Sequence, residues 1–422
     1  MQLNRVVITG MGAVSPFGAG VAELLSGLYQ NRSAVRYCPE MTAIKGLRSL
    51  VAAKVPASVL EIAGKQVARK YRRSMSPMSI YAVLAAAEAM QQAGVGAKEC
   101  ESGRLGVIVG STLASTVTTE DFFNDFARDH SLERMKTSLF FKIMNHTCAA
   151  NIAQTFSIKG RILAPAAACA TGSQSIGYGY EMIATGHQEM LLCGGADEYH
   201  PLTSATFDVM HAASIAYNDD PQHTPRPFSA QRDGMVCGEG SGLLLLESLP
   251  SALKRGASIL GEVVGFATLT DSGNIANPDS KIMVECMNLA LNNAHINAVQ
   301  VGYINAHATA TEQGDIAESH AIATVFSDQT PVSSLKGHLG HTLAASGALE
   351  TIATIDMQHT GHIVPTLHLT EIDSRCAPLN YVREVASSVE LSGNKPIDYA
   401  LKNSFALGGV NTSLVLRRYS SD

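Results

Sequence analysis

The sequence lacks any pair of cysteines at the CxxC spacing, although it contains eight cysteines among its 422 residues. The absence of such pairs argues against the common zinc-binding patterns and against a disulfide framework. Most of the cysteines are therefore expected to be reduced and to pack as small buried hydrophobic side chains. They stand at positions 38, 100, 148, 169, 193, 237, 286 and 376.

Long hydrophobic runs and a strong charge excess are missing too. No apolar stretch approaches the ~18 residues that a membrane-spanning helix needs. The first residues, MQLNRVVITGMG, lack the apolar core and cleavage site of a signal peptide. The formal net charge of −6 argues against a nucleic-acid-binding protein. These absences predict a cytoplasmic protein with no membrane span and no nucleic acid among its partners.

The pattern of apolar residues indicates an α/β protein. Apolar, β-branched runs alternate with helical patterns rich in small residues, and no low-complexity tract or long polar linker separates them. A second round of similar elements begins near residue 257, so we expect two related halves, 1–255 and 256–422. Strands are predicted at 5–9, 104–109, 189–193, 242–247, 302–305 and 412–417, and helices at 18–28, 80–94 and 280–294.

A glycine cluster follows the first predicted strand. Gly10 and Gly12 precede Ser15 and Pro16, where a dinucleotide-binding turn would require a third glycine. The cluster therefore disfavours a nicotinamide site. We interpret it as a tight turn between a strand and a helix.

Cys169 is the cysteine that the local sequence singles out. The segment APAAACATGSQSIG at 164–177 ends a short apolar run at Cys169 and continues with small residues that permit a buried helix. A thiol at a helix N-terminus faces backbone N–H groups, which lower its pKa from about 8.5. This segment is equally compatible with a catalytic nucleophile and with a buried structural cysteine.

Two histidine-bearing loops in the second half favour the catalytic interpretation. His307 lies in INAHATATEQGDIAE, where a strand runs into a loop, and Lys336 precedes His341 by five residues in KGHLGHTLAASG. Imidazoles act as acid–base groups or as donors to developing negative charge. His338 lies in the same stretch, and spacing alone does not choose between His338 and His341.

These motifs resemble those of the β-ketoacyl-acyl-carrier-protein synthases I and II. The resemblance extends over nearly the whole chain and includes several motifs in the family's order. They are ITGMGAVSPFG near the start, ACATG around Cys169, DDPQHTPRPFSAQRDGMVCGEGSG at 219–242, NAHATATEQGD, KGHLGHTLAASG and NSFALGGVN at 403–411. The resemblance implies a thiolase fold, with duplicated halves in five α-β-α-β-α layers, and a dimer.

The resemblance also implies a reaction, a decarboxylative Claisen condensation. Cys169 would accept an acyl group from phosphopantetheine, and malonyl-acyl-carrier protein would lose carbon dioxide and extend the chain by two carbons. His307 and His341 match the family's two catalytic histidines, and the lysine spacing selects His341 over His338. Backbone N–H groups of Cys169 and Leu407 would form the oxyanion hole. No metal and no cofactor of its own is expected.

Further residues receive roles only through this resemblance. Lys336 matches a lysine that organises the site, with Glu318 as its expected ion-pair partner and with Asp315 and Glu350 also organising it. Thr309 and Thr311 match threonines that hold the pantetheine arm. Phe405 and Leu407 match the gate of the acyl pocket, and Arg69 and Lys70 match bases that dock the acidic acyl-carrier protein.

The chain departs from the family pattern at several positions. Ala308 and Ala310 replace the glycine and serine of HGTST, and Leu407 replaces the gating phenylalanine of NSFGFGG. Ser229 replaces an aspartate after RPF and receives no functional account from the sequence. Because leucine is smaller and more flexible than phenylalanine, these changes favour a specialised polyketide or polyene pathway over ordinary fatty-acid elongation.

Three alternatives are weighed against the condensing enzyme. A thiolase would need a second catalytic cysteine near the C-terminus, and the 403–411 motif contains none. A non-catalytic chain-length factor shares the fold but lacks the active-site cysteine. In an acyl-carrier-binding scaffold, Cys169 would never become acylated. The sequence leaves open whether the partner is a second copy or a chain-length-factor-like subunit.

Overall fold

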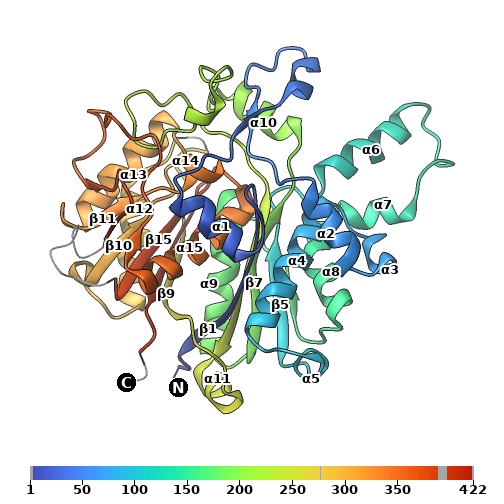
Figure 1. The fold of residues 1–422 in the computed structure, drawn as a ribbon, viewed down its shortest axis with the longest axis horizontal. Coiled ribbons are helices and arrows are strands. Elements are labelled where there is room, and N and C mark those ends of the chain that lie inside the picture. The colour runs from blue at the N-terminus through green and yellow to red at the C-terminus, as the bar shows by residue number, and fades with distance from the viewer. Residues whose placement is uncertain (1–2, 276, 388–396, 421–422) are drawn as a thin grey trace.

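The computed structural model describes residues 3–275, 277–387 and 397–420, which form one large mixed sheet covered by helices (Figure 1). The central helices lie between the two halves of this sheet. In the described ranges, none of the helices combines the length and the apolar character that a membrane crossing requires.

The strands of the N-terminal half pair in a fixed pattern. From β1 outward, the first two pairs of neighbouring strands are antiparallel and the next two pairs are parallel. The order is β1 (Val6–Ser15), β8 (Gly240–Ser248), β7 (Met190–Asp197), β5 (Leu105–Gly110) and β6 (Ile162–Leu163).

The C-terminal half repeats this pattern. Its neighbours also pair antiparallel, antiparallel, parallel and parallel, with one further parallel strand at the edge. The order is β9 (Gly261–Thr270), β16 (Val410–Arg417), β15 (Tyr399–Phe405), β10 (Val301–Asn305), β11 (Pro331–Ser333) and β13 (Asn380–Tyr381). The predicted boundary at 255/256 lies between helix α11 (Leu249–Arg255) and β9, and it stays a prediction.

The helices complete the five layers of the thiolase fold. Helices α9 (Thr171–Ala184) and α15 (Ser346–Thr360) contact strands of both halves. Helices α4 (Pro77–Gln92) and α8 (Thr147–Phe156) cover the N-terminal strands from outside, and α12 (Ser280–Asn293) covers β9 and β16. β1 and β9 pair over Val6–Ile8, which joins the halves. The predicted fold class is therefore confirmed.

The glycine cluster is part of a strand, so its interpretation as a turn is wrong. Gly10 and Gly12 lie inside the ten-residue β1, where helix α4 packs directly against the strand backbone. A Cβ atom on Gly12 would lie 1.9 Å from the carbonyl oxygen of Ala85, and one on Gly10 would lie 2.0 Å from that of Ala89. Glycine is needed here for close packing of helix on sheet.

The remaining elements are shorter or peripheral. Helices α6 and α7 project from the body next to the N-terminal half (Figure 1). The bounds are α1 (Val21–Tyr29), α2 (Ser58–Gln66), α3 (Arg69–Arg72), α5 (Ala97–Glu101), α6 (Thr116–Ala127), α7 (Thr137–Lys142), α10 (Pro201–Val209), α11 (Leu249–Arg255), α13 (Glu312–Val325), α14 (Lys336–Leu339), β2 (Gly18–Ala19), β3 (Arg36–Tyr37), β4 (Val51–Ala52), β12 (His362–Ile363) and β14 (Ala386–Ser387).

Candidate active site

Cys169 lies where the chain enters the central layer. It occupies a short 3-10 turn, Ala168–Ala170, directly before α9, and its side chain is 5% exposed. The turn is held by the Ala167 N–H, which donates to the Thr171 hydroxyl at 2.9 Å. The predicted position at a helix start is therefore the observed one.

The predicted lowering of the thiol pKa is wrong. Burial raises the pKa of Cys169 to about 11, and the nearby negative charge of Asp197 acts in the same direction. The Lys336 ammonium and the N–H groups of Leu407 and Cys169 oppose this rise without overcoming it. Because desolvation penalises the thiolate more than these groups stabilise it, the resting Cys169 is a neutral thiol.

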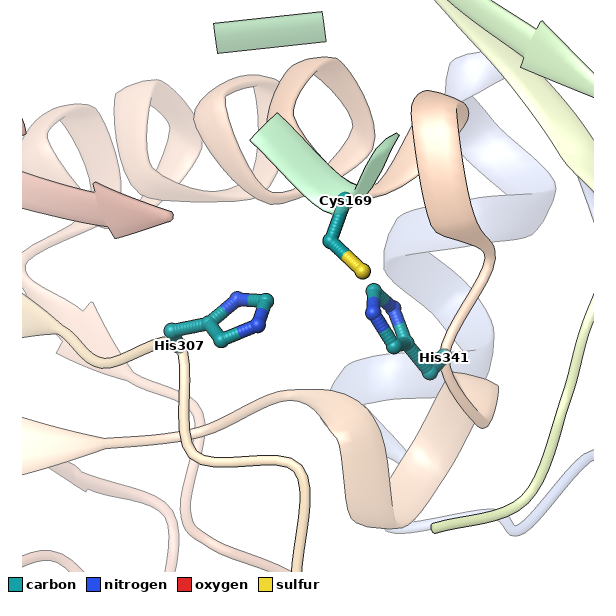
Figure 2. Close-up of side chains that lie close together, drawn as sticks. All are labelled: Cys169, His307 and His341. Atoms are coloured by element: carbon teal, nitrogen blue, oxygen red, sulfur yellow. The ribbon is translucent and has the colours of Figure 1, made fainter. Parts of the chain in front are cut away.

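The fold brings both predicted histidines to Cys169. His307 follows β10, and His341 follows α14, so the three side chains come from three separate segments (Figure 2). The sulfur and one ring nitrogen of each histidine all lie within 4.8 Å of one another. The two imidazole rings are edge to face with their centroids 5.3 Å apart.

The two imidazoles are neutral hydrogen-bonding groups aimed into the site. Burial, together with the positive charges of Lys336 and Lys402, holds the pKa of His307 and of His341 well below the ordinary range. Nδ1 of His341 accepts from the Leu343 N–H at 3.3 Å, which leaves its proton on Nε2. Nε2 of His341 and Nδ1 of His307 find no partner among the described residues. These nitrogens are therefore available to a substrate.

A buried ion-pair cluster lies behind the histidines. The Nζ atom of Lys336 lies 2.6 Å from Oε1 of Glu350, and Nζ of Lys402 lies 2.5 Å from Oε2 of the same carboxylate. The expected pairing of Lys336 with Glu318 is therefore wrong. Lys402 was missed because no strand was predicted at its position, just before the 403–411 motif, so the sequence carried no signal that this lysine is fully buried on β15.

Glu318 and Asp315 organise the histidine loop through its backbone. Glu318 accepts from the N–H groups of His307 at 2.8 Å and of Ala308 at 2.7 Å. Asp315 accepts from the Ala310 N–H at 3.1 Å and pairs with Arg232. Both carboxylates lie on α13 and both are buried, so this helix fixes the loop that carries His307.

A cavity of about 370 Å³ leads to the three side chains, and its lining includes Cys169, His307 and His341. Thr309 and Thr311 line it, with their hydroxyls 3.1 Å apart. Phe405 lies against His307, with ring centroids 6.5 Å apart, whereas the Leu407 side chain is 37% exposed beside the cavity. The residues predicted to hold pantetheine and to gate the pocket thus share one cavity.

Other candidate residues lie away from the cavity. Both ring nitrogens of His338 face backbone carbonyls, of Arg32 and Pro365, so its position supports the choice of His341. Ser229 is buried, and its hydroxyl accepts from the Gln231 N–H at 3.1 Å, which holds a turn. Arg69 and Lys70 are exposed on α3.

Cysteine and histidine side chains are common metal ligands, so Cys169, His307 and His341 would also suit a metal ion. The ammonium groups of Lys336 and Lys402, which act electrostatically on both histidines, disfavour a cation between them. A site without a metal therefore stays the prediction.

The comparisons with known proteins agree with this site. The model of the β-ketoacyl synthase N-terminal domain matches residues 3–252, and that of the C-terminal domain matches residues 260–370. The chain is 34% identical over 419 residues to 3-oxoacyl-[acyl-carrier-protein] synthase 1 of Escherichia coli (strain K12), covering 99% of both chains.

Solved structures show the same similarity. A β-ketoacyl synthase from Burkholderia phymatum STM815 superposes with a TM-score of 0.92 at 41% identity, covering 99% of this chain and 100% of that one. The ishigamide ketosynthase/chain length factor superposes with a TM-score of 0.89 at 30% identity, with the same coverage.

Fold and site together define an acyl-transferring, carbon–carbon condensing enzyme of the thiolase fold. More narrowly, the chain belongs to the β-ketoacyl synthase family, with the 3-oxoacyl-[acyl-carrier-protein] synthases I and II as its relatives.

Proposed function

We propose that Cys169 holds the acyl group during condensation. The observation that carries this proposal is the convergence of the Cys169 sulfur with two unpartnered imidazole nitrogens at the end of a cavity. In the first step the sulfur attacks an acyl thioester of phosphopantetheine. A new C–S bond forms, the old one breaks, and the thiol proton of Cys169 passes to the departing pantetheine sulfur.

Two backbone donors support this transfer. The backbone N–H groups of Leu407 and Cys169 both act to lower the pKa of the Cys169 thiol, which supports them as the donors of the oxyanion hole. Such donors stabilise the tetrahedral oxyanion of both acyl transfers. Gly408 and Gly409 adopt positive φ angles of 87° and 79°, which lets the loop after β15 present the Leu407 N–H.

The histidines then serve the malonyl group. Loss of carbon dioxide leaves an enolate whose oxygen accepts hydrogen bonds from the neutral imidazoles of His307 and His341. The enolate carbon attacks the thioester on Cys169, a C–C bond forms, and the C–S bond breaks to return the thiol after protonation. The N–H on Nε2 of His341 supplies one donor, since its Nδ1 is already an acceptor.

The substrates are delivered by an acyl-carrier protein. The hydroxyls of Thr309 and Thr311 lie along the cavity where a pantetheine arm would pass. Arg69 and Lys70 offer exposed positive charge for an acidic carrier. The names of several relatives mention this carrier, including that of the E. coli synthase. Phosphopantetheine belongs to the carrier and is substrate here.

The enzyme acts with a second subunit of its own fold. Strand β6 forms the edge of the N-terminal sheet, and its two side chains, Ile162 and Leu163, are 42% and 43% exposed. Apolar residues on α6 and α7 and at Leu113 are also exposed, including Phe123 and Phe140. An apolar surface beside an unpaired strand edge fits a sheet-forming partner, either a second copy or a chain-length-factor-like subunit.

Leu407 sets the class of acyl group. It stands beside the cavity where the family has phenylalanine, and only its backbone is needed for the oxyanion hole. A shorter, flexible side chain admits bulkier or stiffer acyl groups, which fits a polyketide or polyene pathway better than fatty-acid elongation. The neighbour named for an ishigamide ketosynthase is consistent with this choice.

Acylation of Cys169 tests the proposal. Incubation with an acyl-loaded carrier protein should add the acyl mass to the peptide that contains Cys169, and Cys169→Ala should abolish the adduct. Cys148→Ala, at another buried cysteine on α8, serves as the matched control and should keep it. His341→Ala should keep acylation but lose malonyl decarboxylation. Folded wild-type protein that binds the carrier yet never acylates would favour the scaffold or chain-length-factor alternative.

A further inference from the structure

The cavity runs from the buried catalytic groups to the protein surface. Its lining includes Cys169 and His341, which are 5% and 1% exposed, whereas Met210 and Ile275, at 39% and 76% exposed, lie at its mouth. His211 also lines the cavity and is exposed, so it belongs to the mouth. A pantetheine arm whose sulfur end reaches Cys169 therefore has its outer part at this mouth.

The end of helix α10 places His211 at the mouth. His211 follows the C-cap residue Met210, has a φ angle of 56° and donates its backbone N–H to the Asp208 carbonyl at 3.0 Å. A positive φ is uncommon for a residue other than glycine. His295, after α12, has a φ of 55° and a similar bond to the Asn292 carbonyl at 3.1 Å, but it does not line the cavity. The two histidines share a backbone geometry and differ in their position at the cavity.

Arg48 fixes the imidazole ring of His211. Nη2 of Arg48 donates to Nδ1 of His211 at 3.1 Å. Arg48 is itself held by Asp208, since its Nε donates to Oδ1 at 2.8 Å and its Nη2 donates to the Asp208 carbonyl at 2.6 Å. Because a guanidinium group can only donate, Nδ1 of His211 accepts and the ring proton lies on Nε2. Among the described residues, Nε2 of His211 has no hydrogen-bond partner, so its N–H is open to a ligand.

The charges around the cavity favour a neutral partner for this donor. Carboxylates line it, among them Asp233, Asp271 and Glu312. Arg232 lines it too, but its guanidinium group pairs with Asp373 at 2.6 Å. A phosphate would meet like charge here, whereas an amide carbonyl needs only a neutral N–H donor. The pantetheine arm has an inner amide near its sulfur and an outer amide toward its phosphate, and the outer amide is the group that fits the mouth.

We propose that His211 binds the outer amide of the pantetheine arm, with its Nε2–H donating to the amide carbonyl, and that Arg48 is a positioning residue that holds the ring in the donating tautomer. The inference rests on the proposed delivery of substrates by an acyl-carrier protein. Thr309 is buried in the same cavity and so lies deeper than the exposed His211, which means that the two residues bind different parts of the arm. His211 contributes to substrate binding and takes no part in the chemistry at Cys169.

The test compares three thioesters, without a carrier protein, in single-turnover acylation of Cys169 by His211→Gly. Acyl-phosphopantetheine and acyl-pantetheine contain the outer amide, whereas the acyl-N-acetylcysteamine thioester ends after the inner amide. We expect the half-saturating concentration to rise about tenfold with the first two and to stay within about twofold with the third, with maximal rates within about twofold of wild type. Glycine tolerates the positive φ, and His295→Gly is the matched control, which should behave as wild type with all three.

Arg48→Met tests the positioning role. Without the guanidinium group the ring of His211 is no longer held in one tautomer, so the half-saturating concentration of acyl-pantetheine should rise about threefold. The double variant should match His211→Gly alone, because Arg48 acts through the ring, and independent, additive effects would overturn the role of Arg48. Arg48→Gln, whose amide can both donate and accept, replaces the methionine variant if thermal unfolding shows that variant to be misfolded.

The remaining outcomes overturn the proposal for His211. A rise confined to acyl-phosphopantetheine would show that His211 binds the phosphate, and an equal rise with all three thioesters would show an effect at the inner arm or at the thiol. No rise with any of them would leave His211 without a role in binding the arm. Failure of wild-type protein to become acylated by any thioester would instead refute the function proposed for Cys169.

Discussion

Glu350→Gln removes the carboxylate shared by two buried lysines, and we expect it to be among the most destabilising single substitutions in this protein. Lys336 and Lys402 lie 2.6 Å and 2.5 Å from its two oxygens, and Ser346 donates to Oε1 at 3.2 Å. Glutamine offers one carbonyl oxygen and turns its amide hydrogens toward the other ammonium group. Leaving a buried charge unpaired costs about 3–5 kcal/mol, so the free energy of unfolding should fall by about that amount at pH 7.

The destabilisation caused by Glu350→Gln should depend on pH, and the pKa of Glu350 gives the direction. The two ammonium groups outweigh burial and hold the pKa of Glu350 below its ordinary value. A carboxylate with a lowered pKa stabilises the fold above its unfolded pKa of about 4.3, and this contribution is lost as the pH falls through the folded value. The difference between Glu350→Gln and wild type should therefore be complete at pH 6–7 and shrink in strong acid.

Urea unfolding followed by circular dichroism measures the effect. Glu285→Gln, at an exposed position on α12, is the matched control and should stay within about 0.5 kcal/mol of wild type. A Glu350→Gln variant within about 1 kcal/mol of wild type at pH 7 would show that the lysines are not charged in the folded protein.

Three further predictions concern the thiol, the sheet and the gate. Because burial raises the pKa of Cys169 to about 11, the rate of iodoacetamide labelling of its peptide should rise about tenfold per pH unit between pH 7 and 10. A rate that levels off below pH 8 would instead show that the pKa is lowered, as the helix start alone predicts. Gly12→Ala would place a Cβ atom 1.9 Å from the Ala85 carbonyl oxygen and should lower the free energy of unfolding by at least about 1–3 kcal/mol. The control Gly64→Ala, in open space on α2, should be neutral or stabilising. Equal effects of the two substitutions would contradict the packing of α4 on β1. Leu407→Phe should shift the ratio of kcat/KM values toward slimmer acyl groups in a panel of acyl-carrier substrates, and an unchanged ratio would rule out Leu407 as the determinant.

The local sequence predicted element types well and element limits less well. β7 was predicted at 189–193 and extends over Met190–Asp197, because its last residues, Gly194 to Asp197, lie against a buried neighbour and need no apolar side chain to remain in the sheet. β1 was predicted to end at Thr9 and continues to Ser15. In the sequence alone its glycines look like turn residues, and only the close packing of α4 against the strand explains why they are glycines.

The sequence by itself determined which residues meet in the site. The motifs that carry Cys169, His307, Lys336 and His341 occur in the family's order. These residues could therefore be named from the sequence without knowing how far apart they lie in space. The tertiary structure decided what these groups experience. It pairs Lys336 with Glu350 instead of Glu318, buries Lys402 beside them, and raises the pKa of Cys169 where the helix start alone predicted a fall. Desolvation and ion pairing depend on everything packed around a group, and residues distant in sequence supply that environment.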